Sequence, residues 1–190
     1  MKYYLSILIT VICLISCDNV EEDNLTSDNT FSLDNVKYET PHCFVEDWGI
    51  EAGNRDLREY TILLASDEHD GDPFVLENPN THALTFVLFS PSLTELASGE
   101  YILTTATDYT LCSKEWKPGY YLGTSVGTKL KENQKDIMYC PGGKITVKKL
   151  ADHEYYFSYS STCDNGKSLK GSFKGSITML DNIKWGCWDE

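Results

Sequence analysis

Residues 123–127 read Gly-Thr-Ser-Val-Gly, which matches the GxSxG motif of serine hydrolases. In that motif the serine lies at a sharp turn between a strand and a helix, at the edge of an α/β sheet. Asp136 and His153 follow in the order that such hydrolases use. The chain, however, has no long apolar pattern of helical period from which an α/β sheet could be covered. We therefore interpret the glycines as turn residues and expect no catalytic residue and no enzyme.

A second candidate site is the carboxylate-rich segment 67–72, Asp-Glu-His-Asp-Gly-Asp. If Gly71 took the invariant glycine position of a calcium loop, Glu77 would fall at the final bidentate position. Ser66 stands where the first aspartate is needed, however, and Pro73 follows the segment. The four histidines are too scattered to form a metal pair. We interpret the segment as a solvated loop, keep a weak calcium site as the alternative, and expect no resident metal or cofactor.

Aromatic residues gather in the turn-rich segment 116–121, Trp-Lys-Pro-Gly-Tyr-Tyr. Sugar-binding β-sandwiches often stack the apolar face of a pyranose ring on exposed aromatic rings, whose faces are electron-rich. Trp116, Tyr120 and Tyr121 are therefore candidate ligand-binding residues. The alternative is that these rings pack into the core, where most aromatic side chains are buried.

The cysteines limit the possible cross-links. Of the seven cysteines, Cys13 lies inside an apolar leader and Cys17 lies at its end. The five that remain are Cys43, Cys112, Cys140, Cys163 and Cys187. Because five is odd, an exported protein would form at most two bridges and keep one thiol. The sequence does not determine the connectivity; our preferred pair is Cys112–Cys140, which would link the least regular part of the chain.

The elements that position these residues follow a leader at residues 1–16. Residues 5–15 form an almost unbroken apolar run, shorter than the about 20 residues that span a bilayer and typical of a signal peptide. The next step, Leu-Ile-Ser-Cys at residues 14–17, resembles the bacterial lipobox. The resemblance implies cleavage after residue 16 and acylation of Cys17, whose several acyl chains would anchor the protein stably. A plain signal peptide with an incidental cysteine is the alternative.

Residues 17–29 are acidic and polar, and with so few apolar side chains we expect a disordered tether. The acidic cluster after Cys17 resembles the signal by which Bacteroidetes-type bacteria export lipoproteins to the cell surface. The resemblance implies a surface-exposed outer-membrane lipoprotein; retention at the inner membrane and a simple spacer remain alternatives. The formal net charge of −13 disfavours nucleic acid and anionic headgroups, so the expected membrane contact is the lipid anchor alone.

Residues 30–190 read as one domain of short strands. Residues 60–65 and 83–89 are apolar on both faces, as in the central strands of a sheet. In the last third, apolar and polar residues alternate as in half-buried antiparallel strands. Other short strands are expected at 43–48, 101–105, 109–113, 120–123 and 136–140, and residues 91–96 fit one helical turn. About ten short strands predict an all-β antiparallel sandwich, with an open β-barrel as the alternative.

Two turns determine the expected registers. The first is a two-residue Asp34-Asn35 turn, whose residues tolerate positive φ. The second is a three-residue loop at 164–166 with Gly166 in the left-handed conformation; a two-residue turn here would set apolar against polar faces. A tyrosine ring can also cover the bare backbone of a facing glycine. The expected pairs are Leu33–Val36, Phe31–Tyr38, Phe157–Phe173, Tyr159–Gly171 and Tyr155–Gly175.

The hairpin patterns at 31–38, 143–147, 155–157 and 165–175 resemble a large pool of Bacteroidetes lipoproteins, single β-domains behind a lipobox and mostly without assigned function. The resemblance implies fold and location but no catalytic residue. We hypothesise a non-catalytic extracellular binding module, with a glycan as one candidate ligand. A structural or adhesion component of the envelope that binds surface proteins is the alternative.

We predict that Cys17 carries the lipid. Mass spectrometry of the native protein should show an acylated amino-terminal cysteine, and Cys17→Ser should move the protein out of the membrane fraction. Cys13→Ser is the matched control, because Cys13 would be removed with the leader. An unmodified amino terminus or a cytosolic location of the native protein would contradict this expectation.

Overall fold

The computed structural model describes residues 25–50, 57–68, 82–103, 119–127 and 137–180. Twelve strands make up these ranges: β1 (Thr30–Leu33), β2 (Val36–Glu39), β3 (His42–Ile50), β4 (Arg58–Ala65), β5 (Ala83–Ser90), β6 (Gly99–Leu103), β7 (Tyr120–Gly127), β8 (Ile137–Cys140), β9 (Lys144–Ala151), β10 (Glu154–Thr162), β11 (Ser168–Ser176) and β12 (Thr178–Leu180). Across the same ranges, no helix has the length and apolar character needed to cross a membrane.

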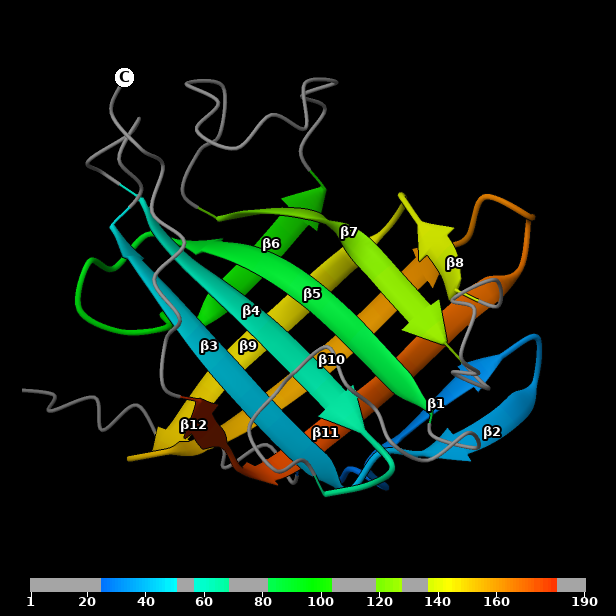
Figure 1. Cartoon of the computed structure of the whole chain (residues 1–190), viewed down its shortest axis with the longest axis horizontal. Helices are drawn as coiled ribbons and strands as arrows, with labels where there is room; N and C mark the ends of the chain where they lie inside the picture. Colours follow the sequence, from blue (N-terminus) through cyan, green and yellow to red (C-terminus); the bar gives the residue numbers. More distant parts are fainter. Residues whose placement is uncertain (1–24, 51–56, 69–81, 104–118, 128–136, 181–190) are drawn as a thin grey trace, which may run out of the picture.

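The strands pair in the order β12-β3-β4-β5-β7-β6-β9-β10-β11-β1-β2, with β8 beside β7. This ladder folds over into two layers that cross face to face, with β3, β4, β5 and β7 in front and β6, β9, β10 and β11 behind (Figure 1). The layers join where β6 and β7 pair in parallel. β12 also pairs with β3 in parallel, and the other neighbouring pairs are antiparallel. The predicted all-β sandwich is therefore confirmed.

The core lies between the two layers. Each strand sends alternate side chains inward, so Phe86 from the front layer meets Tyr159 from the back layer with ring centroids 5.0 Å apart. Phe157 and Phe173 pack side by side on the back layer at 6.1 Å, and both are 1% exposed. Burying one such side chain contributes about 1.5–3 kcal/mol, which makes this layer contact the main source of stability.

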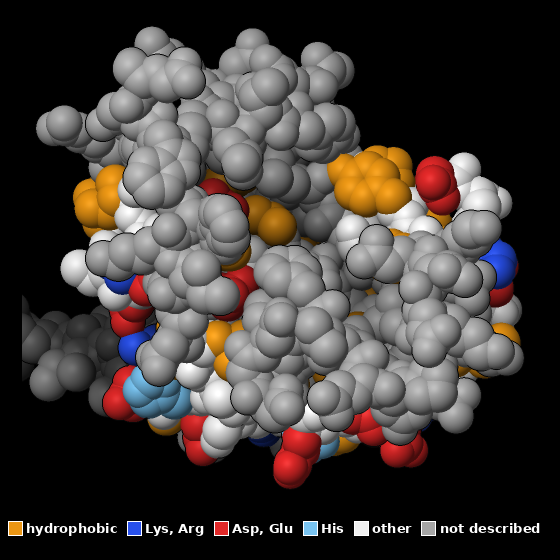
Figure 2. Space-filling model, in the orientation of Figure 1, with side chains coloured by type: hydrophobic (Ala, Val, Ile, Leu, Met, Phe, Trp, Pro, Cys, Tyr) orange, Lys and Arg blue, Asp and Glu red, His pale blue; other side chains and the backbone are white. Residues whose placement is uncertain are grey.

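The front layer is apolar on its outer side as well. Phe44, Leu63, Ala65 and Ala83 form a second buried cluster there, and Leu180 from β12 packs against it. Figure 2 views this side, where apolar side chains (orange) are visible and carboxylates (red) follow the lower margin. The cluster explains why the sequences of β4 and β5 are apolar on both faces, and β4 and β5 lie inside the sheet as predicted.

Both turn predictions are confirmed. Asp34 and Asn35 have positive φ, and Gly166 has φ 81° with its N–H donating to the Cys163 carbonyl at 2.9 Å. Gly166 can take this conformation because it has no Cβ. All five expected pairs are present: Leu33–Val36, Phe31–Tyr38, Phe157–Phe173, Tyr159–Gly171 and Tyr155–Gly175.

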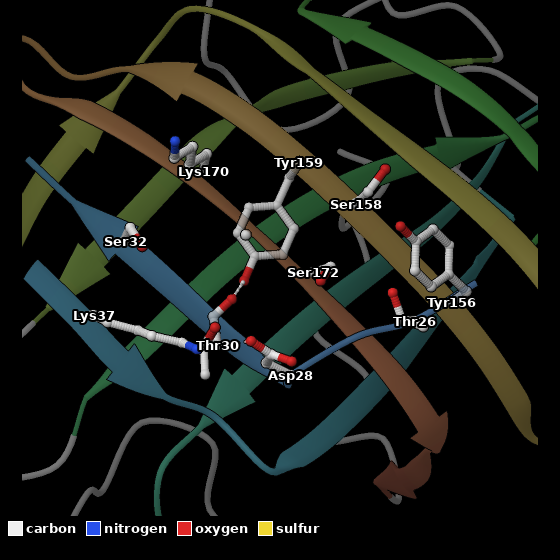
Figure 3. Close-up of a pocket in the computed structure, with 11 residues that line it drawn as sticks. Thr26, Asp28, Thr30, Ser32, Lys37, Tyr156, Ser158, Tyr159, Lys170 and Ser172 are labelled. Atoms are coloured by element: carbon white, nitrogen blue, oxygen red, sulfur yellow. Dashed lines mark hydrogen bonds and ion pairs between the residues drawn. The ribbon is translucent and has the colours of Figure 1, made fainter. Parts of the chain in front are cut away.

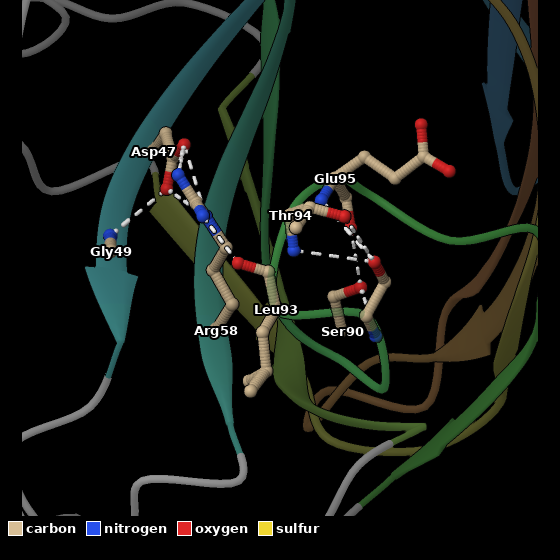
Figure 4. Close-up of polar contacts among 8 residues, drawn as sticks. Asp47, Gly49, Arg58, Ser90, Leu93, Thr94 and Glu95 are labelled. Carbon is tan, nitrogen blue, oxygen red and sulfur yellow. Dashed lines mark hydrogen bonds and ion pairs between the residues drawn. The ribbon is translucent and has the colours of Figure 1, made fainter.

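The expected helical turn at residues 91–96 is wrong, because the segment forms bends. The buried Ser90 hydroxyl accepts hydrogen bonds from the backbone N–H groups of Ser92 and Ala97, each at 3.1 Å, and donates to the Glu95 carbonyl at 2.8 Å (Figure 4). Serine side chains that bond nearby backbone groups compete with helical hydrogen bonds. The strand expected at 109–113 lies outside the described residues.

A charged pair closes the same end of the sandwich. Arg58 on β4 donates to the Asp47 carboxylate on β3 at 2.5 and 2.9 Å, and to the Leu93 carbonyl at 2.5 Å (Figure 4). The guanidinium also lies 5.9 Å from the centroid of the Tyr60 ring. Arg58 therefore links β3 and β4 to the loop after β5, and we assign it a structural role.

The predicted Cys112–Cys140 disulfide is wrong, because Cys140 is bonded to Cys163. Two hydrogen bonds bring these two cysteines together: Asp164 N–H donates to the Tyr139 carbonyl at 2.9 Å, and the Ser161 hydroxyl donates to the Cys140 carbonyl at 3.1 Å. The bridge joins β8, which pairs with β7 of the front layer, to the end of β10 in the back layer. It therefore cross-links the two layers rather than the irregular segment.

We predict that removing this bridge destabilises the domain. The cysteines are 23 residues apart, and a loop of this size corresponds to about 3 kcal/mol of chain entropy in the unfolded state. The free energy of unfolding of Cys140→Ser/Cys163→Ser, measured with urea under oxidising conditions, should fall by about that amount. The buried, free Cys43 provides the control. A reducing agent should lower the free energy of unfolding of Cys43→Ala as much as it lowers that of the native protein.

Candidate functional site

The sequence-predicted ligand residues are only partly within the described chain. Trp116 lies outside it, as do Cys17 and Cys112. Tyr120 and Tyr121 begin β7, where their backbones pair with Phe89 and Leu88 of β5, but their side chains are outside the described part. The prediction that these three aromatic residues form a ligand site therefore concerns side chains outside the described part of the chain.

The other two motifs do not form sites in the described ranges. Ser125 lies in the middle of β7, between Thr85 and Tyr139 on the neighbouring strands, and not at the exposed turn that a nucleophile requires. Most of the acidic segment 67–72 lies outside the described chain, as does Glu77. Among the described residues, no three His, Cys, Asp or Glu side chains lie close enough to hold a metal ion. Cys43 is fully buried, and burial raises the pKa of its thiol, so the reactive thiolate is disfavoured.

The outer face of the back layer is polar. The register places its outward residues in rows across the strands. Across β9, β10, β11 and β1, one row contains only hydroxyl side chains, and it lies between two rows that contain lysines; on β2 this row continues with Glu39. The rows are Thr146–Ser158–Ser172–Thr30, then Lys148–Tyr156–Lys174 on one side and Lys144–Ser160–Lys170–Ser32–Lys37 on the other.

An open hollow of about 550 Å³ lies on this face. Tyr156 and Ser158 of β10, Lys170 and Ser172 of β11 and Ser32 of β1 surround it (Figure 3). Hydroxyl groups both donate and accept hydrogen bonds, and the edge of the hollow adds an aromatic ring and charged groups. The chemistry of the lining is therefore that of a site for a polar ligand with many hydroxyl groups.

The wall of the hollow is the segment just before β1, which contributes Thr26 and Asp28. Ser27 Oγ lies 3.0 Å from Ser172 Oγ, and the Asn29 side chain accepts from Lys174 N–H at 2.8 Å and donates to its carbonyl at 3.2 Å. Residues 25–29 are thus part of the folded domain. The expectation that the disordered tether extends to residue 29 is wrong, because these residues bond to β11.

The floor of the hollow depends on a missing side chain. Gly171 lies between Tyr159 on β10 and Phe31 on β1, and the Tyr159 ring fills the space beside it. The Tyr159 hydroxyl reaches the Thr30 carbonyl at 3.5 Å, and burial raises the pKa of this tyrosine. A Cβ on Gly171 would lie 2.6 Å from Tyr159 Oη, which is closer than atoms pack.

Charge at the hollow is unevenly neutralised. Lys37 pairs with Asp28 at 2.7 Å, and this hydrogen bond together with the lysine charge lowers the pKa of Asp28 below its ordinary value. Lys144, at the other end of the same row, pairs with Glu100 at 2.6 Å. Lys170 lies between them and forms no ion pair with any residue that the structure describes. Within the part of the chain that the structure describes, the row therefore has one exposed cation, Lys170, that is not paired with a carboxylate.

Comparisons with known proteins find nothing similar: no family model, no curated protein and no solved structure matches the chain.

The sequence contains a signal for this face that the motif-based predictions missed. The polar halves of the alternating strands, Ser168–Lys170–Ser172–Lys174 and Tyr156–Ser158–Ser160, are themselves a pattern of hydroxyls and lysines. Alternation predicts that these residues face water, but the register of β1 and the placement of residues 25–29 are needed to reveal the hollow. Those two features depend on contacts between residues about 145 positions apart.

We predict that Gly171→Ala disrupts the floor. The added methyl group would push the Tyr159 ring or β1 aside, and such overpacking costs about 1–3 kcal/mol. Urea unfolding should show this loss. Gly166→Ala is an informative comparison, since it has open space but a positive φ and should lose only about 1 kcal/mol. Equal stability of Gly171→Ala and the native protein would contradict the packing described above.

Proposed function

We propose that the chain is a lipid-anchored protein of the bacterial outer surface whose folded domain is a non-catalytic module that binds a glycan. The observation that carries the binding part is the hollow on the outer face of β10, β11 and β1, with its row of hydroxyls. The anchor rests on the leader and Cys17 in the sequence. Neither part requires a metal or a cofactor.

A glycan fits this hollow better than an apolar ligand does. Ser158, Ser172 and Thr30 offer donors and acceptors at the spacing of neighbouring strands, about 5 Å. Tyr156 adds a ring at the edge, on which the apolar face of a sugar can stack. The hollow is open and shallow, which suits one part of an extended chain rather than an enclosed small molecule.

The adhesion alternative has less support in the described strands. Partners that add a strand need a long, unpaired edge. The described edge strands β2, β8 and β12 have only 4, 4 and 3 residues, and short edges of this kind resist pairing with other chains. A protein partner would therefore have to use a face rather than an edge.

The anchor and the hollow are compatible in position. Residues 25–29, which form the wall, directly follow the acidic segment that begins after Cys17. The proposed ligand face thus lies on the side of the domain where the tether joins it. A glycan bound there would lie close to the point where the tether meets the domain, which suits a polymer of the cell's own surface or its immediate surroundings.

The proposal is tested with residues 18–190 on an array of neutral and acidic polysaccharides. Ser158→Ala should weaken binding about fivefold, because one hydrogen bond contributes about 1 kcal/mol. Ser176→Ala, on the same face but outside the hollow, is the matched control and should bind as the native protein does. The absence of any glycan binding that Ser158→Ala weakens would count against the proposal.

A further inference from the structure

We propose that the glycan bound in this hollow is anionic, and that Lys170 binds its carboxylate or sulfate group. The inference rests on the proposed glycan-binding function. It adds the charge of the ligand and the residue that binds the charged group. Both kinds of anion offer oxygen acceptors to an ammonium group, so the shared chemistry is an acidic sugar.

The row that contains Lys170 has an uneven balance of charge. Lys144 and Lys37 stand at its two ends, and each has a carboxylate within 2.7 Å. Lys170 stands between them, is exposed, and lines the hollow, whereas Lys144 does not. A bound anion would therefore find one ammonium group that pairs with no carboxylate of the described residues, and the flanking pairs would be left intact.

Lys170 also lies among the hydroxyl side chains of this face. It is on β11 two residues from Ser172, and side chains two apart on a strand share a face at about 7 Å. Ser32 lies opposite Lys170 on β1, and Ser160 lies opposite on β10. The cation is thus surrounded by hydroxyl side chains, so one sugar unit can use its hydroxyls and its anionic group at the same time.

Asp28 is the one carboxylate among the described residues that line the hollow. It could repel an anion, but its charge is held by Lys37 at 2.7 Å. The lowered pKa of Asp28 means that this pair stays formed at neutral pH, and it is lost only as the pH falls through that lowered value. The repulsion is therefore compensated under the conditions in which the ligand would bind.

The net charge of the whole chain affects where an acidic polymer can bind. The formal net charge is −13, so an acidic polymer would be repelled from most of the surface. A single unmatched lysine in a hydroxyl-lined hollow would select where such a polymer binds. Surface charges act over about 8–10 Å at physiological salt, so Lys170 would act at contact range.

The experiment compares two pairs of polymers that differ in charge. Residues 18–190 are tested by biolayer interferometry against polygalacturonate and its methyl ester, and against dextran sulfate and dextran. The native protein should bind at least one acidic polymer about tenfold or more tightly than its neutral counterpart, because a hydrogen bond to a charged group contributes about 1.5–3 kcal/mol. The polymer pair that shows the preference distinguishes a carboxylate from a sulfate.

Two charge-matched variants identify the residue. Lys170→Gln should remove the preference for the acidic polymer, and Lys170→Arg should retain most of it. Lys167→Gln changes the net charge equally but lies in the β10–β11 turn away from the hollow, and it should bind as the native protein does. An equal loss in Lys167→Gln and Lys170→Gln would overturn the assignment, since it would show general electrostatic attraction.

The two proposals fail in different ways. If neutral and acidic polymers bind equally and Ser158→Ala still weakens binding, the acidic-sugar inference is wrong and the glycan-binding function stands. If neither the four polymers nor any glycan on the array binds, both are wrong. Because Lys170 is exposed, its variants should unfold at the same urea concentration as the native protein, and this measurement excludes misfolding as the cause of lost binding.

Discussion

The contact between the Tyr159 ring and Gly171 is the constraint on which the back layer depends. Gly171 has no side chain, so the ring fills the space beside it and the Tyr159 hydroxyl reaches the Thr30 carbonyl of β1. That close approach lets β1 pair with β11 over four residues, with Thr30 opposite Ser172. The same tyrosine also meets Phe86 across the core, so the floor of the hollow and the contact between the layers share one side chain.

The placement of β1 in turn builds the wall of the hollow. Residues 25–29 precede β1 and must pass over β11, where Asn29 takes both backbone bonds of Lys174. These are the bonds that another strand would otherwise make, so the segment acts as a short extension of the pairing. The wall of the hollow is therefore held by side chains of residues 25–29 that bond to β11, whereas the residues on β1, β10 and β11 are placed by the strand register.

Much of the fold could be predicted from the sequence because it depends on local patterns. Alternation identified the strands of the last third, and the left-handed Gly166 determined the β10–β11 register to the residue. The failures have two causes. The Cys140–Cys163 bridge and the path of residues 25–29 depend on contacts between residues far apart in the sequence. The bends after Ser90 depend on local hydrogen bonds of the Ser90 side chain, which compete with a helical turn. The register within each hairpin could be inferred from its turn, whereas the pairing of one hairpin with another strand, such as β1 with β11, could not.

The candidate site shows the same division. The sequence pattern favoured Trp116, Tyr120 and Tyr121, because aromatic residues in a turn are a recognised chemical signal. Serines, threonines and lysines line most of the hollow that the structure describes, and in any single strand they look like ordinary solvent-facing residues. They form a recognisable surface only when three strands align a hydroxyl row beside Lys170, which has no carboxylate partner among the described residues. In a sandwich of this kind, the outward residues of a strand can form a recognition surface while the inward residues stabilise the fold. Variants of outward residues, such as Lys170→Gln, can therefore separate binding from stability.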